Sequence, residues 1–524
     1  MRIFAAAAAM VVLTSCSYFL TSHDQMRGTQ EKLDPIELTV LENREDVLNL
    51  GRDLGCSDRL LRARSIEEFY DDSEPARTFK VGIIELSDDG HVTDDIQERQ
   101  VLDMVRDEAA AEKGALIVTF VHGWHHRPKV CDNNLACFRR VLYLLSKAEQ
   151  KGKGRRVVGV YIGWRGDSWK KPRFVNFYDR KSTAHKIGHD GGREVLLELN
   201  EIYERAACRG ACGEAPGHRV RMVTVGHSFG GALVFSAMEG VFVRELRKQH
   251  VVGREAVVQG GRDVRPLRPG IGDLVVLVNP AFEALRYRWF DADLKTRGHY
   301  NPKQLPVLLT VSSEADNAVK WAFPIGRTLY FLVKPWNFRG MSDIIGAGRY
   351  DPQITHDLVL TDRKGKPIEH PDRLPTPTDN RTPEQKKAQE KEIKERCALL
   401  AEGDLPICEC EYTLPDELTT APEEMITQGS GAVPVNYKDK GKNNEQVMLR
   451  IRANWWDPTT PFLVARASAD VIPAHSDIYT QRFVSFLVGY ISAFVQEAEK
   501  EPAPCNKDPL RFNVAPKTEA SSNR

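Results

Sequence analysis

The chain has 524 residues, of which 41% are hydrophobic and 28% are charged, a composition typical of a folded protein with a large buried core. Its 73 basic residues balance its 73 acidic residues. A nucleic-acid partner would need a basic surface to neutralise its phosphates, so this balance argues against one. We therefore expect a small or neutral ligand, while protein partners stay undetermined.

The N-terminus has the pattern of a signal peptide. An apolar run at 3–13 follows a basic residue and is too short to span a bilayer, so we predict that 1–15 is removed. The sequence Leu-Thr-Ser-Cys at 13–16 resembles the bacterial lipobox. This resemblance implies a lipidated Cys16 that anchors the protein to the cell envelope, and Ser17 resembles the sorting class of the outer membrane facing the periplasm. An ordinary signal peptide with an incidental Cys is the alternative.

Apolar runs alternate with helical patterns through most of the chain. After the polar segment at 16–70, which we interpret as a tether and irregular structure, a strand is expected at 79–86 and a helix at 95–113. Further strands are expected at 115–121, 156–162, 219–225, 274–278, 305–311 and 461–467. Further helices are expected at 135–151, 192–207, 231–248 and 482–500.

This alternation predicts an α/β fold. Parallel strands need crossover connections, so apolar strands separated by helices are typical of a mainly parallel sheet with helices on both faces. One folded domain is expected over 71–333 and 445–500. The polar stretch at 334–444 is interpreted as a long, partly disordered insertion that forms a lid or subdomain, or a passive surface excursion. A charged helix is expected at 384–400 and a disordered tail at 501–524.

The cysteines suit an oxidising compartment. Besides Cys16 there are nine, and an odd number leaves at least one unpaired. A C-x-C pair without a matching second pair is a poor metal signal. Two close pairs would close small loops as disulfides, namely Cys131 with Cys137 and Cys208 with Cys212.

The segment Gly226-His227-Ser228-Phe229-Gly230 carries the strongest chemical signal. It follows an apolar strand and precedes a helix, the setting that a nucleophilic serine at the apex of a tight turn requires. Such a turn has no room for side chains at Gly226 and Gly230, and it projects the hydroxyl above the sheet near a helix N-terminus. We predict Ser228 as the nucleophile; an ordinary serine in a glycine turn is the alternative.

A second loop would supply part of an oxyanion hole. The expected strand at 115–121 runs into His122-Gly123-Trp124, which resembles the loop that forms half of the oxyanion hole in α/β-hydrolases. The backbone N–H groups of Trp124 and Phe229 would then point toward the oxygen that becomes negative in a tetrahedral intermediate. His122 is expected to support this loop rather than to act as a base.

Two other histidine pairs have the residue type of a metal site. His125 and His126 are adjacent, and His185 and His189 have the i, i+4 spacing of one helix face. No carboxylate completes either ligand set, so we expect no metal.

The general base is predicted after the last strand. His475 follows the apolar strand expected at 461–467 and precedes the closing helix, which is the position of the base in this order of elements. His356 is the competitor, but it lies within 334–444 and no parallel strand is expected before it.

The acid that orients the base should end a strand between the serine and the histidine. The strand expected at 305–311 is followed by Glu314 and Asp316. Asp316 is preferred because it lies farther into the loop, and Glu314 is the reserve.

With these residues in the order Ser, Asp, His, the chain resembles the α/β-hydrolase superfamily, particularly its bacterial esterase/lipase-like members. The resemblance covers about 79–494, and 159–165 and 277–281 match those members more than general lipases. It implies hydrolysis of a small-molecule or lipid ester through an acyl-enzyme, with no cofactor. A non-catalytic envelope binding or scaffolding lipoprotein on the same fold, or an acyltransferase with the same triad, are the alternatives.

Overall fold

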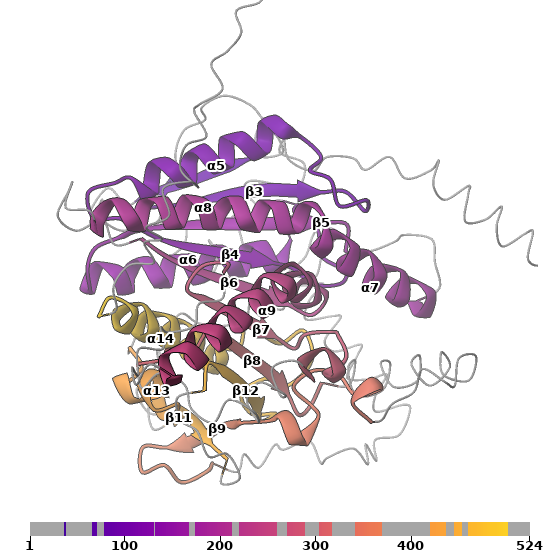
Figure 1. Ribbon diagram of the computed structural model, residues 1–524, viewed down its shortest axis with the longest axis vertical. Coiled ribbons are helices and arrows are strands. Elements are labelled where there is room, and N and C mark those ends of the chain that lie inside the picture. The colour runs from indigo at the N-terminus through magenta and orange to yellow at the C-terminus, as the bar shows by residue number, and fades with distance from the viewer. Residues whose placement is uncertain are drawn as a thin grey trace, which may run out of the picture.

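The described part of the protein is built around one large sheet (Figure 1). The computed structural model describes residues 36–37, 65–70, 78–129, 132–166, 173–211, 220–258, 270–288, 303–316, 341–368, 420–435, 445–452 and 460–500. Within these ranges the sheet has 12 strands, in the order β1-β2-β3-β5-β4-β6-β7-β8-β12-β9-β11-β10. The predicted signal peptide at 1–15, Cys16, the helix at 384–400 and the tail at 501–524 lie outside the described residues.

The middle of the sheet is parallel and apolar. Its strands are almost entirely buried, as expected where helices cover both faces. The predicted α/β fold with a mainly parallel sheet is therefore confirmed. In sheet order these strands are β3 (Phe79–Leu86), β5 (Arg156–Trp164), β4 (Ala115–Val121), β6 (Arg221–His227), β7 (Leu274–Val278), β8 (Leu308–Ser313) and β12 (Phe462–Ala467).

Helices cover both faces of this sheet and enclose two apolar cores. In β4, Val118 and Phe120 belong to one core, whereas Ile117 and Val121 belong to the other, because side chains alternate along a strand. The first core contains α6 (Asn133–Lys151) and α14 (Gln481–Ala498). The second contains α5 (Asp95–Ala109), α7 (Arg173–His189), α8 (Gly191–Ala211) and α9 (Phe229–Val258). Of the helices described, none is long and apolar enough to cross a membrane.

The direction of the chain through the sheet reverses between β4 and β6. β5 follows β4 in sequence but lies on the side of β3, whereas β6 and β7 lie on the opposite side. Helix α6, which leaves β4, joins one core, and α9, which leaves β6, joins the other. Open α/β sheets bind their ligands at such a switch point, beyond the carboxyl ends of the strands. The loops after β4 and β6 are therefore the expected place of a functional site.

The described parts of 334–444 extend the sheet, which corrects their interpretation as a lid or subdomain. β9 (His356–Asp362) pairs in parallel with β12, and β11 (Glu445–Ile451) and β10 (Gly431–Pro434) follow in antiparallel pairs. Side chains of β9 alternate between buried and half-buried, so this strand lacks the continuous apolar run that marks the central strands. The short elements here and after β7 are η2 (Ala284–Tyr287), η5 (Met341–Asp343), η6 (Asp351–Gln353) and α13 (Glu423–Thr427).

The polar segment at 16–70, interpreted as a tether and irregular structure, contributes two strands in its described residues. β1 (Ile36–Glu37) pairs with β2 (Ile66–Tyr70), and β2 pairs in antiparallel with β3. Glu67 of β2 is buried and accepts hydrogen bonds from the Arg139 guanidinium of α6 at 2.8 and 2.7 Å. A charged residue can be buried when a partner of opposite charge meets it. That partner lies 72 residues away, so no local pattern could indicate it.

Among the cysteines, Cys137 is disulfide-bonded, in agreement with the expectation that it pairs. Its predicted partner Cys131 lies outside the described residues. Cys208 is part of α8, and its predicted partner Cys212 also lies outside them.

Replacing Glu67 with Gln tests whether β2 belongs to the core. The change removes the carboxylate that faces the buried Arg139 guanidinium, and we expect the free energy of unfolding to fall by about 3 kcal/mol in urea denaturation. The matched Glu201→Gln variant breaks an exposed ion pair with Arg205 on α8, and it should cost less than about 1 kcal/mol. Equally small losses in both variants would contradict a buried role for β2.

Candidate functional site

Three non-glycine residues of the described chain have a positive φ, and all three lie at the carboxyl edge of the sheet. His125 (φ 68°) follows β4, Ser228 (φ 55°) follows β6 and Asn279 (φ 44°) follows β7. Such conformations cost about 1–3 kcal/mol each and concentrate at functional sites, where the surrounding structure imposes them. These three neighbouring loops therefore mark the candidate site.

Ser228 occupies the apex of the turn between β6 and α9. Its N–H donates to the Val278 carbonyl at 3.0 Å, and its own carbonyl accepts the N–H of Ala281 at 3.0 Å. These two hydrogen bonds fix the turn to the end of β7. Because α9 begins at Phe229, the N-terminus of this helix lies directly beside Ser228, where its partial positive charge favours a developing anion.

Glycines are required on three sides of Ser228. A Cβ at Gly226 would lie 2.9 Å from the carbonyl oxygen of Gly230, and a Cβ at Gly230 would lie 2.0 Å from that of Val121. A Cβ at Gly123 would lie 2.7 Å from the Cβ of Ser228. Real side chains essentially never make such contacts, so the structure leaves no room for a side chain at Gly226 or Gly230, where a steric role was predicted, or at Gly123. The loop after β4 thereby touches the serine directly.

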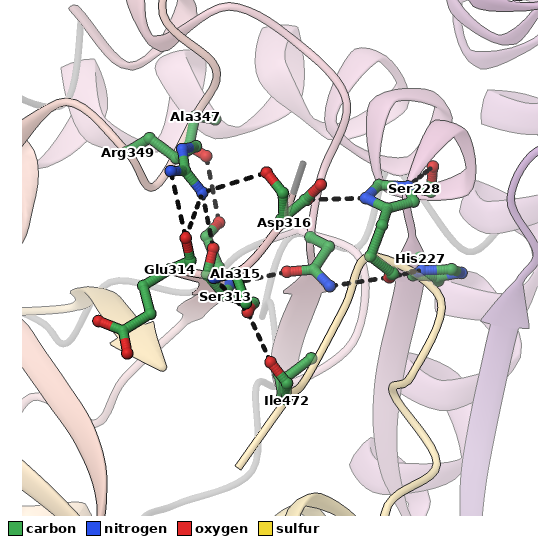
Figure 2. Close-up of polar contacts among 12 residues, drawn as sticks. His227, Ser228, Ser313, Glu314, Ala315, Asp316, Ala347, Arg349 and Ile472 are labelled. Atoms are coloured by element: carbon green, nitrogen blue, oxygen red, sulfur yellow. Dashed lines mark hydrogen bonds and ion pairs between the residues drawn. The ribbon is translucent and has the colours of Figure 1, made fainter. Parts of the chain in front are cut away.

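Ser228, His475 and Asp316 form one continuous chain of hydrogen bonds. Figure 2 labels its two ends, Ser228 and Asp316. Ser228 Oγ lies 2.7 Å from His475 Nε2, and His475 Nδ1 lies 2.7 Å from Asp316 Oδ2. A carboxylate only accepts hydrogen bonds, so the Nδ1–H group donates a hydrogen bond to Asp316. Nε2 then accepts a hydrogen bond from the Ser228 hydroxyl. Asp316 follows β8, and His475 lies between β12 and α14. The structure thus brings together the three residues predicted as nucleophile, base and acid.

The reserve acid Glu314 does not reach His475. Its carboxylate accepts the N–H of Ala469 at 3.1 Å, and in Figure 2 it points away from Asp316 and Ser228. Glu314 therefore ties the loop after β8 to the end of β12, while Asp316 meets the imidazole.

Trp124 and Phe229 present the backbone N–H groups predicted for the oxyanion hole. Phe229 is the first residue of α9, so its N–H has no acceptor within the helix. Across the part of the chain that the structure describes, neither N–H has a hydrogen-bond partner. The two side chains pack together, with ring centroids 6.3 Å apart, and Phe177 of α7 packs against both. Two unpaired donors beside a serine are available to an oxyanion.

His122, predicted to support the loop after β4, makes two hydrogen bonds to the main chain through its ring. Its Nε2 accepts the Trp164 N–H at 3.0 Å, and its Nδ1 donates to the Gly123 carbonyl at 2.9 Å. These bonds require a neutral imidazole, and burial lowers the pKa of His122 to about 4. Its ring stacks on that of Trp164, with a centroid distance of 5.7 Å. His122 therefore holds Gly123 near Ser228.

The competing base His356 lies away from Ser228. It begins β9, and β7, β8 and β12 separate this strand from β6 in the sheet. Its Nδ1 lies 2.6 Å from Thr355 Oγ1, and burial lowers its pKa to about 4. A buried histidine in this position is a core residue rather than a base for Ser228.

The two histidine pairs considered as metal sites make other contacts. His126 Nδ1 lies 3.2 Å from Asp132, the N-cap of α6, and His185 Nδ1 lies 2.9 Å from Ser236 Oγ. The Arg286 guanidinium also lies 2.9 Å from His185, where a second cation would be repelled. Over the residues that the structure describes, no group of three potential ligands could hold a metal.

The loop that carries Asp316 has supports that the sequence does not reveal (Figure 2). Ser313 Oγ donates to the Ile472 carbonyl at 2.6 Å and so joins this loop to the one that carries His475. The Arg349 guanidinium donates to the Ser313 carbonyl at 2.7 Å. Arg349 belongs to the segment interpreted as an insertion, so that segment supports the acid from beside the sheet.

Two further residues contact the main chain of His475. His227 Nε2 and Asn279 Nδ2 lie 3.0 and 2.9 Å from its carbonyl oxygen. Both positions carry a signal that sequence reasoning missed: His227 precedes the nucleophile, and Asn279 is the first polar residue after an apolar strand beside it. Polar residues at the carboxyl ends of neighbouring parallel strands meet at one edge.

Comparison with known proteins adds one weak similarity. No protein-family model matches the chain, and no curated protein matches it. Among solved structures, the Tle1 effector bound to the VgrG spike from the type 6 secretion system matches with a TM-score of 0.13 and 12% identity, over 64% of this chain and 68% of that chain. A similarity this low carries no inference about fold or activity, so the function is inferred from the site geometry.

Proposed function

We propose that this protein is a serine hydrolase with an α/β-hydrolase fold that cleaves ester or related acyl bonds. The observation that carries the proposal is the chain of hydrogen bonds from Ser228 through His475 to Asp316, with 2.7 Å at each link. A nucleophile, a base and an orienting acid in this relation form the machinery of acyl transfer on several unrelated folds. The strained turn at Ser228 and the unpaired N–H groups beside it support the same chemistry.

Each residue has a defined role in the proposed reaction. Ser228 Oγ attacks the carbonyl carbon of the substrate while its proton passes to His475 Nε2. Asp316 stabilises the resulting imidazolium, and the N–H groups of Trp124 and Phe229 bind the oxyanion. His475 then protonates the leaving alcohol, and an acyl-enzyme remains on Ser228. A water molecule, deprotonated by His475, releases the acid and restores the serine.

The substrate in this proposal is a small-molecule or lipid ester, and the reaction requires no cofactor. The lipobox resemblance at Cys16 supports a location at the bacterial cell envelope, where several acyl chains on one residue anchor a protein stably to a membrane. The disulfide at Cys137 is consistent with an oxidising compartment such as the periplasm.

Labelling with a fluorophosphonate probe tests the nucleophile. We expect the wild-type protein to be labelled and Ser228→Ala to lose both labelling and ester hydrolysis, by at least about 10³-fold, because no other oxygen replaces the attacking one. The matched Ser236→Ala variant removes a buried hydroxyl about two helix turns further along α9 and should be labelled like the wild type. If the wild-type protein is folded but not labelled, the hydrolase proposal fails, and a non-catalytic binding protein is the remaining interpretation.

Paired substitutions test the acid. The amide of Asp316→Asn can donate to His475 Nδ1 and favour the tautomer with the proton on Nε2, which cannot accept from Ser228, so kcat should fall by about 10³–10⁴-fold. Glu314→Gln keeps an oxygen for the Ala469 N–H, and its kcat should stay within about threefold. Steady-state hydrolysis of a chromogenic ester measures both, and the reverse result would reassign the acid.

His356→Gln separates the competing base from the stability of the fold. Because the pKa of His356 is lowered to about 4, the unfolded chain binds its proton first as the pH falls below about 6.5, and stability is lost between these values. The wild type should therefore lose about 2 kcal/mol more than the variant between pH 7.5 and pH 5 in urea denaturation. Labelling of Ser228 at pH 7.5 should be unchanged; its loss from a folded variant would point to His356 as the base.

A further inference from the structure

The main-chain carbonyl of His475 is held by two side chains at once. Asn279 Nδ2 donates to it at 2.9 Å and His227 Nε2 donates at 3.0 Å. Both residues are buried, with exposed fractions of 1% for Asn279 and 2% for His227. Water therefore does not compete strongly for either hydrogen bond. His475 is thus held through its backbone as well as through its ring.

The amide of Asn279 has only one orientation available. Its Oδ1 accepts the Ser313 N–H at 2.8 Å, which leaves Nδ2 to face His475. The Asn279 N–H donates to the Val311 carbonyl at 2.8 Å, and its φ of 44° is one that Asn tolerates better than most residues. Asn279 thus joins the ends of β7 and β8 to the loop that carries His475.

His227 is restricted to one protonation state. Its Nε2 must carry a proton, because the carbonyl that it contacts only accepts hydrogen bonds. Burial, and after it the charge of His475, lowers the pKa of His227 well below the usual value, so the ring is neutral. The ring centroids of His227 and His475 lie 5.4 Å apart. Because His227 is covalently joined to Ser228, it ties the main chain of the base to that of the nucleophile.

We propose that Asn279 and His227 are positioning residues of the site, which fix the His475 backbone so that its imidazole bridges Ser228 and Asp316. The inference depends on the proposed hydrolase function, and it adds a second support for His475 beside that from Asp316. Asp316 orients the ring from one end, and the two donors hold the peptide from the other. Loss of a donor should therefore slow the proton transfer from Ser228, and it should leave substrate binding nearly unchanged.

The Asn279→Asp substitution tests this role in the full-length protein. Aspartate has nearly the same shape, retains an acceptor for the Ser313 N–H and tolerates a positive φ, but at about pH 8 it presents an oxygen instead of a donor to His475. We expect kcat for a chromogenic ester to fall by about 10–100-fold while KM changes by less than about threefold. His227→Phe keeps an aromatic ring without the donor and should show the same split, which preserves the test if one variant does not fold.

The matched control is Asn200→Asp. Asn200 is also buried, and its Oδ1 accepts the N–H of Gly272 at 2.8 Å. Gly272 precedes β7, so this contact lies at the amino edge of the sheet, opposite the edge that carries His475. This variant should lose stability in thermal denaturation but keep the wild-type kcat. A general loss of packing would lower the melting temperature of all three variants alike and leave kcat per folded molecule unchanged, and that result would overturn the proposal.

A measurement independent of turnover separates this inference from the proposed function. In the wild type, the His475 Nδ1 proton held against Asp316 should give a far-downfield proton NMR signal, which Asn279→Asp should broaden or shift and Asn200→Asp should not. If the wild type neither hydrolyses esters nor reacts with a fluorophosphonate, the hydrolase proposal fails, and the NMR comparison still decides the role of Asn279. An unchanged signal in Asn279→Asp and His227→Phe would exclude the positioning role.

Discussion

The chain around Ser228 is packed so closely that glycine is the only residue that fits at Gly226, Gly230 and Gly123. Main chain from β4, β6 and the start of α9 therefore meets at van der Waals distance around one hydroxyl. Because these contacts are between backbones on rigid elements, the positions of the nucleophile and of the two neighbouring N–H donors do not depend on side-chain rotamers. The other parts of the proposed machinery are arranged around this fixed point.

The base and acid loops are fixed to one another as well as to the serine. Ser313 reaches the loop of His475 through the Ile472 carbonyl, and Arg349 holds the start of the acid loop. The strands that carry these loops, β8 and β12, lie inside the sheet, because β9, β11 and β10 continue it beyond β12. An interior strand is hydrogen-bonded on both sides, so both loops start from a rigid base.

The order of elements was sufficient to predict the fold class and the proposed triad. Strands β3, β4 and β7 have the predicted bounds. β4 and β7 are almost continuous apolar runs between polar turns, and in β3 the apolar residues predominate although Lys80 and Glu85 interrupt them. β2 and β9 were missed for the opposite reason: their polar residues are buried or half-buried only because partners from distant segments cover them, as Arg139 covers Glu67. The roles of His227 and Asn279 are likewise tertiary, since both depend on a carbonyl that arrives about 200 residues or more later in the chain.

The proposed triad joins residues far apart in the sequence, with 247 residues between Ser228 and His475 and 159 between Asp316 and His475. Contacts of this kind are slow to form, because a long loop must close before they contribute any energy. His475 reaches its place only when β12 enters the sheet between β8 and β9. A partly synthesised or partly folded chain therefore has Ser228 without its proposed base, and we expect it to be inactive toward esters. In the proposed mechanism, activity would therefore depend on completion of the sheet.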